Sequence, residues 1–124
     1  TMLNQESAST FYVAATALGK IGSTKALNPL IASLDVPNYW NRRAVVSALG
    51  AIGSEKAVDP LLKILGEAEL NVHVKRAIMV AFLKIGSKQT VSALKKALSD
   101  EDAEARLYAG EALKRISTGK SKIK

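Results

Sequence analysis

Four isoleucines recur at nearly constant spacing along this chain, each at the end of a segment whose apolar residues have helical spacing. They are Ile21, Ile52, Ile85 and Ile116, which lie 31, 33 and 31 positions apart. Two sets of leucines in the segments that follow keep the same steps of 31 and 33: Leu30, Leu61 and Leu94, and Leu34, Leu65 and Leu98. A fixed period of this length is the signature of a solenoid, in which each repeat packs against its neighbours. The chain is therefore predicted to fold as stacked helical hairpins.

Each repeat follows the order helix, tight turn, helix. Gly53 and Gly86 follow the first helix of their repeats and suit the left-handed conformation in which helices commonly end. Pro29 and Pro60 lie near the start of the second helix, where a missing N–H costs little. The helix that contains Pro29 is therefore expected either to begin near Asn28 or to bend there. The loop 66–71 is two residues longer than its counterparts, which explains the step of 33. The predicted helices cover residues 7–21, 25–34, 40–52, 56–65, 72–85, 89–98 and 103–116.

Composition narrows the class of protein. The 124 residues suit one domain, predicted at 1–118 and followed by a basic, flexible tail at 119–124. The absence of cysteine excludes disulfides and thiolate chemistry. No apolar run reaches ~18 residues and the first residues lack a signal-peptide pattern, so a soluble cytoplasmic protein with no membrane partner is expected. The formal net charge of +7 is better explained by solubility than by binding to nucleic acid.

The best-defined repeat begins at Arg42 and follows the pattern Ala-Leu-Gly-x-Ile-Gly-x-x-x-Ala-x-x-Pro-Leu-x-x-x-Leu from Ala48 to Leu65. It resembles the short HEAT-like repeats first associated with phycobilisome lyases, and the resemblance covers residues 7–117. The resemblance implies an all-α fold, an α-solenoid that forms a right-handed superhelix of antiparallel helix pairs, with about seven helices in three and a half repeats. It also implies that the helix before each Ile-Gly turn lines the concave side. The sequence departs from the pattern at Asn41, where valine is usual.

The predicted concave groove gathers most of the unusual side chains. In the first helix of each repeat, the Ala-Leu-x-x-Ile positions are expected to face the core. The residues on the opposite side of the same helix, which include Ala44, are then expected to face the groove. Aromatic and arginine side chains are enriched at interface hot spots. Three basic residues lie next to the groove-facing positions on their helices: Arg42, Lys75 and Arg106. They are expected to bind loop carboxylates and carbonyls of the neighbouring repeat. The residues predicted to bind a partner are Tyr12, Trp40, Arg43, His73, Arg76, Lys84, Tyr108 and Arg115.

Groups suited to catalysis are few. A metalloenzyme built on related repeats uses His-Glu pairs, whereas His73 is the only histidine here, so no metal site is expected. The acidic residues of 67–69 and 100–104 lie in predicted loops between helices. They are better explained as solvated helix caps than as a carboxylate pair for acid–base catalysis. The run from Gly50 to Gly53 ends a helix and lacks the strand and lysine of a phosphate loop. The sequence therefore predicts no catalytic residue, no metal and no cofactor.

Three functions are open at this point. The favoured one is a non-catalytic interaction and scaffold module that holds a partner protein or peptide in the concave groove. The second is nucleic-acid binding, with bases stacked on the aromatic side chains. The third, a subunit of a bilin lyase, is implied by the resemblance alone. The second rests on five basic groove residues against two acidic ones, a balance of +3: Lys20, Arg43, Arg76, Lys84 and Arg115 against Glu104 and Glu111.

The chain begins with half a repeat. The first predicted helix has no partner before it in the sequence, whereas terminal repeats normally carry a polar outer face. We therefore expect either a preceding helix, supplied by a longer protein, or self-association through Phe11, Val13 and Ala14.

Overall fold

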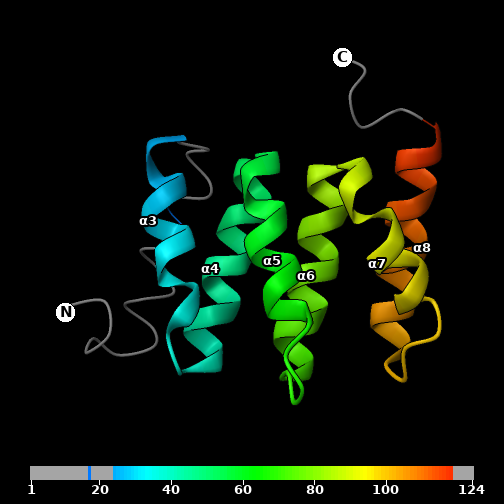
Figure 1. Ribbon diagram of the computed structural model, residues 1–124, viewed down its shortest axis with the longest axis horizontal. Helices are drawn as coiled ribbons and strands as arrows, with labels where there is room; N and C mark the ends of the chain where they lie inside the picture. The colour runs from blue at the N-terminus through cyan, green and yellow to red at the C-terminus, as the bar shows by residue number, and fades with distance from the viewer. Residues whose placement is uncertain (1–16, 18–23, 119–124) are drawn as a thin grey trace.

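The computed structural model describes residue 17 and residues 24–118 (Figure 1). Residues 24–118 contain six α-helices, joined by short 3₁₀ turns and loops, and no β-strand. The predicted all-α fold is confirmed. The predicted helix at 7–21, the N-terminal self-association surface and the tail at 119–124 lie outside the described residues. The helices are α3 (Leu27–Ala32), α4 (Tyr39–Ile52), α5 (Val58–Leu65), α6 (Val72–Ile85), α7 (Val91–Ala97) and α8 (Ala103–Thr118).

The helices form two layers of an α-solenoid. In Figure 1 the short helices α3, α5 and α7 lie in front of the long helices α4, α6 and α8. The long helices pack directly side by side, α4 on α6 and α6 on α8. The short helices stand farther apart from one another, as expected of a stack that curves toward the long-helix layer. The right-handed superhelix and the concave side stay predictions.

An Asx cap begins each long helix. Asn38 Oδ1 accepts hydrogen bonds from the backbone N–H groups of Trp40 (2.8 Å) and Asn41 (3.1 Å). Asn71 stands 33 positions later and caps α6 in the same way, and Asp102 accepts from the N–H of Ala105 to cap α8. Because of its cap, α4 begins at Tyr39, which the sequence assigned to the preceding loop.

The short helices start with a 3₁₀ turn. The sequence predicted continuous helices at 56–65 and 89–98, whereas for 25–34 it predicted a start near Asn28 or a bend there. These turns are η1 (Thr24–Ala26), η3 (Glu55–Ala57) and η4 (Lys88–Thr90), and a further turn, η2 (Ser33–Asp35), follows α3. The hydroxyls of Ser54 and Ser87 accept from the N–H two residues ahead, both at 3.1 Å, and so begin η3 and η4. Proline is not the cause, because Ala93 replaces it in the last of these segments.

The core lies between the two layers, and α6 occupies its centre. Val74, Ile78, Met79 and Phe82 on α6 have no exposed surface, since α4 and α8 cover both sides of this helix. At Gly50 in α4 the backbones of α4 and α6 approach each other closely. A Cβ at this position would lie 2.9 Å from the Cα of Ala81 in α6, so the contact needs glycine. The repeat thus holds its long helices close enough for side chains on adjacent helices to touch.

Candidate functional site

The N-terminal ends of α4 and α6 carry three aromatic rings in mutual contact. The ring of Trp40 lies 4.9 Å from that of Tyr39 and 5.6 Å from that of His73, measured between centroids, and Tyr39 lies 6.3 Å from His73. The guanidinium of Arg43 stands 5.5 Å from the centre of the Trp40 ring, within cation–π range. We call Tyr39, Trp40, Arg43 and His73 the aromatic cluster.

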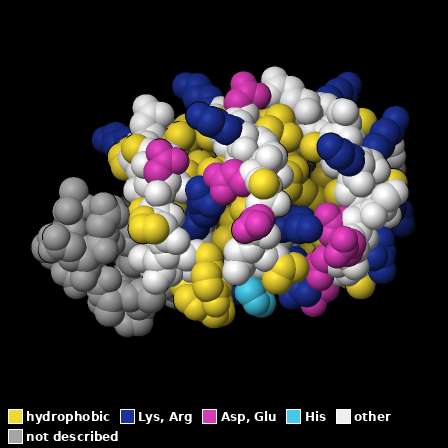
Figure 2. All heavy atoms as spheres, turned by 60° about the horizontal axis from the view of Figure 1, so that its bottom comes forward, with side chains coloured by type: hydrophobic (Ala, Val, Ile, Leu, Met, Phe, Trp, Pro, Cys, Tyr) yellow, Lys and Arg dark blue, Asp and Glu magenta, His cyan; other side chains and the backbone are white. Residues whose placement is uncertain are grey.

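The aromatic cluster is open to solvent. Tyr39 is 39% exposed and Trp40 is 44% exposed, which makes them two of the four large hydrophobic side chains that residues 24–118 leave exposed. Figure 2 shows the histidine beside apolar side chains on the face where α4 and α6 begin. Exposed aromatic rings that already hold one another in place present a large, ordered surface and lose little freedom on binding.

The repeat explains why these residues meet. Trp40 and His73 are 33 positions apart and each lies two residues after its capping asparagine. Because α4 packs alongside α6, equivalent positions on the two helices become neighbours. The structure therefore brings together Trp40, Arg43 and His73, three of the residues predicted for the groove. Their role in binding a partner stays a prediction. Tyr39 was missed because the sequence placed it in a loop.

Arg76 does not join the aromatic cluster. Its Nε and Nη2 donate to the two carboxylate oxygens of Asp102 at 2.9 and 2.6 Å, and Glu104 lies 3.9 Å away. The hydrogen bonds from Arg76 lower the pKa of Asp102 to about 2, against a smaller opposing effect of desolvation. The same carboxylate caps α8, so Arg76 connects α6 to the start of the next long helix. Its predicted role in binding a partner stays a prediction.

The other predicted groove residues are scattered. Lys84 is exposed, Tyr108 is half-buried against the core, and Tyr12 lies outside the described residues. Arg115 Nη1 donates to the carbonyl of Leu83 at 2.6 Å and so connects α8 to α6. Ala44 is only 1% exposed, which corrects its predicted place in the groove. Because α3 and α6 both pack on α4, the accessible stripe of this helix is narrower than helical phase alone predicts.

Arg42 and Lys75 connect the repeats, as the sequence predicted. Arg42 donates to the carbonyl of Leu34 (2.8 Å) and to both carboxylate oxygens of Glu67 (2.9 and 3.0 Å). Lys75, its equivalent one repeat later, pairs with both oxygens of Asp100 at 3.0 and 2.9 Å. Burial acts to raise the pKa of Asp100, but the N–H of residue 102 and the Lys75 ammonium outweigh it and hold that pKa below its usual value.

Arg106 continues the same series. Its Nη1 donates to the carbonyl oxygens of Asp100 (2.7 Å) and Glu101 (3.2 Å), in the loop that leads into α8. The sequence predicted loop carbonyls as its partners, and this contact is present, although the loop belongs to its own repeat. All three basic residues of this series are therefore engaged in contacts that hold the fold.

Comparison with known families fits this geometry. A family model of HEAT repeats matches residues 1–81. The chain belongs to the HEAT repeat family. Repeats of this family commonly mediate protein–protein interaction. The match is to HEAT repeats in general, and the likeness to the phycobilisome-lyase repeats stays a prediction. No curated protein matches the sequence.

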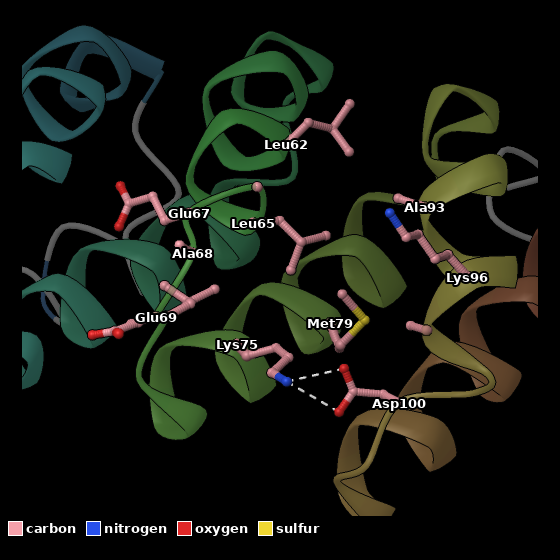
Figure 3. Close-up of a pocket in the computed structure, with 13 residues that line it drawn as sticks. Leu62, Leu65, Glu67, Ala68, Glu69, Lys75, Met79, Ala93, Lys96 and Asp100 are labelled. Carbon is pink, nitrogen blue, oxygen red and sulfur yellow. Dashed lines mark hydrogen bonds and ion pairs between the residues drawn. The ribbon is translucent and has the colours of Figure 1, made fainter.

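This HEAT repeat protein also has a pocket that the sequence did not predict. It lies between α5 and α7 over α6, has a volume of about 390 Å³, and is bordered by the loop 66–70 (Figure 3). The loop is the one that carries two additional residues. The longer loop could have indicated an irregularity between these two repeats, but the sequence did not show which side chains would line the pocket.

The described part of this HEAT repeat chain offers no cluster of three His, Cys, Asp or Glu side chains that could hold a metal ion. The imidazole ring of His73 stacks on the rings of Tyr39 and Trp40. No helix in residues 24–118 combines the length and the apolar character that a membrane crossing needs.

Proposed function

We propose that this HEAT repeat protein is a non-catalytic interaction module and that the aromatic cluster is its contact with a partner protein. The observation that supports the proposal is the exposed stack of Tyr39 and Trp40 on His73, with Arg43 over the indole. Aromatic and arginine side chains dominate the binding energy of protein interfaces. The rings are ordered by one another before a partner arrives, which reduces the entropy lost on binding.

The charges favour a protein partner over nucleic acid. Nucleic-acid binding needs cations free to neutralise phosphates. Of the basic residues predicted for the groove, Arg76 is paired with Asp102 and Arg115 is bonded to a backbone carbonyl. Within the described part of the predicted groove, only Arg43, which lies over Trp40, and Lys84 lack such a polar partner. The surface around the aromatic cluster therefore lacks the dense row of available cations that a phosphate backbone would require.

The test compares capture of partner proteins from an extract of the source cell by three immobilised proteins. They are the wild type, the double variant Tyr39→Ala with Trp40→Ala, and the control Leu107→Ala. Leu107 is 56% exposed and lies on α8, whereas the aromatic cluster is carried by α4 and α6, so its change removes an exposed apolar side chain outside the cluster. A partner retained by wild type and control should bind the double variant about 30-fold more weakly, on the hot-spot scale of ~2 kcal/mol.

Circular dichroism should show the same helix content for all three proteins, because the changed side chains are exposed. Equal capture of every retained protein by the double variant would refute the site. A titration with short DNA and RNA over a salt series tests the alternative. Saturable binding to either nucleic acid that weakens steeply with salt would favour nucleic acid as the ligand.

A further inference from the structure

The pocket between α5 and α7 is apolar inside. Leu62 and Leu65 point from α5 into the gap, Met79 of α6 lies between the two short helices, and Ala93 forms part of the α7 wall (Figure 3). Ala93 stands where the preceding repeats have proline. The volume of about 390 Å³ falls within the range of ~300–1,000 Å³ that is typical of ligand sites. A side chain of leucine or phenylalanine size can therefore enter it.

One charged group in this pocket is available to a ligand. Lys75 and Asp100 neutralise each other at one end (Figure 3). Glu67 is paired with Arg42, and its carboxylate points away from the gap, as does that of Glu69. Lys96 instead reaches from α7 toward the gap, and no ion pair or hydrogen bond joins it to the described residues. The pocket thus combines an apolar interior with an unpaired ammonium at its edge.

The pocket is also open along one side. Gly66, Glu67, Ala68 and Glu69 on one border and Lys96 on the other are all exposed. Sites for small molecules bury most of their ligand's surface. A short segment of a larger chain suits an open pocket better, because one side chain fills the gap while the backbone stays outside.

We infer that this pocket binds a segment of a partner protein in which an apolar side chain of leucine or phenylalanine size stands next to a carboxylate. The apolar side chain would lie between Leu62, Leu65 and Ala93, and the carboxylate would pair with Lys96. The two parts of the ligand match the two parts of the pocket, apolar interior and single free cation. The pocket lies between the short helices, so this site is separate from the aromatic cluster and does not depend on it.

The methionines supply a direct readout. The chain has two, Met2 and Met79, and the second borders the pocket. Protein labelled with ¹³C at the methionine methyl groups gives one signal for the pocket and one for the N-terminal region. The first probe is the capped dipeptide N-acetyl-phenylalanyl-aspartyl amide, whose ring should shift the Met79 signal in a saturable way. The neutral isostere with asparagine should bind about three- to fivefold more weakly, the upper range for an exposed ion pair. The dipeptide with alanine in place of phenylalanine should leave the Met79 signal unchanged.

Two lysine variants separate a specific pair from general charge. Lys96→Gln should remove the preference for the aspartyl over the asparaginyl dipeptide. Lys95→Gln should keep it, since Lys95 is the preceding residue on α7, is also exposed and does not line the pocket. Both variants lose one positive charge, so long-range attraction changes equally.

Several results would overturn the inference. One is a Met79 signal that does not shift or does not saturate with the phenylalanyl dipeptide. Another is loss of the aspartate preference in Lys95→Gln as well. Loss of dipeptide binding in the double variant Tyr39→Ala with Trp40→Ala would place the probe at the aromatic cluster instead. Binding of 3-phenylpropanoate about tenfold tighter than the dipeptide would assign the pocket to a small carboxylate.

Discussion

Two helical glycines, Gly50 in α4 and Gly110 in α8, differ in how closely other atoms approach them. Replacement by alanine should therefore stabilise the protein at Gly110 and destabilise it at Gly50. A Cβ on Gly110 would have Leu98 Cδ2 at 3.9 Å as its nearest neighbour, an ordinary van der Waals contact. Alanine there gains helix propensity and restricts the unfolded chain, which should stabilise the protein by ~0.5–1 kcal/mol.

The same propensity gain applies at Gly50, but the space does not exist. The added Cβ would lie 2.9 Å from the Cα and 3.0 Å from the Cβ of Ala81. Backbone cannot rotate away as a flexible side chain can, so α4 and α6 must separate. Overpacking of this kind costs ~1–3 kcal/mol. Because the propensity gain is common to both variants, this cost is also the expected difference in unfolding free energy between Gly110→Ala and Gly50→Ala.

Urea unfolding followed by circular dichroism at 222 nm measures both variants against wild type. The slope of free energy with urea should stay constant, so that the midpoints report stability alone. Gly50→Ala should unfold at lower urea than wild type and Gly110→Ala at higher urea. If Gly50→Ala stabilises the protein as much as Gly110→Ala, the close contact between α4 and α6 does not exist as described.

Three further outcomes follow from the core, a buried amide and an ion pair. Leu49→Ala should lower the unfolding free energy by ~2–5 kcal/mol in urea titrations, whereas the exposed Lys63→Ala should change it by no more than ~0.5 kcal/mol. Asn41→Val should raise the unfolding free energy by ~1 kcal/mol, because Asn41 is buried and its Oδ1 has no hydrogen-bond partner; a loss of stability would contradict this. The pKa of Asp102 falls from 3.8 to about 2 on folding, so its stabilising effect is complete above pH 3.8 and is lost as pH falls toward 2. In melting curves from pH 6 to 2, Arg76→Gln should therefore lose less melting temperature than wild type, and equal losses would refute the linkage.

The helices were predictable because the sequence repeats its apolar pattern. The range 72–85 for α6 was predicted to the residue, since Gly86 ends the helix in a left-handed conformation (φ 66°) and the apolar spacing is continuous up to it. The start of α4 was missed by one residue. Asn38 caps this helix, and the equivalent Asn71 33 positions later was a readable signal for both caps.

The division of roles between Arg43 and Arg76 could not be predicted from helical phase. The two residues occupy equivalent positions, 33 apart, and phase exposes both. The difference lies in the capping residue of the next repeat, which is Asn71 for Arg43 and Asp102 for Arg76. A neutral amide leaves Arg43 available to lie over the indole, whereas the carboxylate binds Arg76. A single residue in a neighbouring repeat therefore decides which arginine reaches the candidate site.

Within residues 24–118, the side-chain bonds between repeats join residues that are close in the sequence. The side-chain bonds that join Arg42 to Glu67, Lys75 to Asp100, Arg76 to Asp102 and Arg115 to Leu83 span 25, 25, 26 and 32 positions. Each long helix packs against the next long helix along the chain. A newly synthesised chain can therefore form each helical hairpin, and its bonds to the adjacent repeat, before the repeats farther along the chain have been synthesised. Chains with such local contacts fold on the order of microseconds to milliseconds. Under a pulling force, the same arrangement lets the molecule unravel from one end, repeat by repeat.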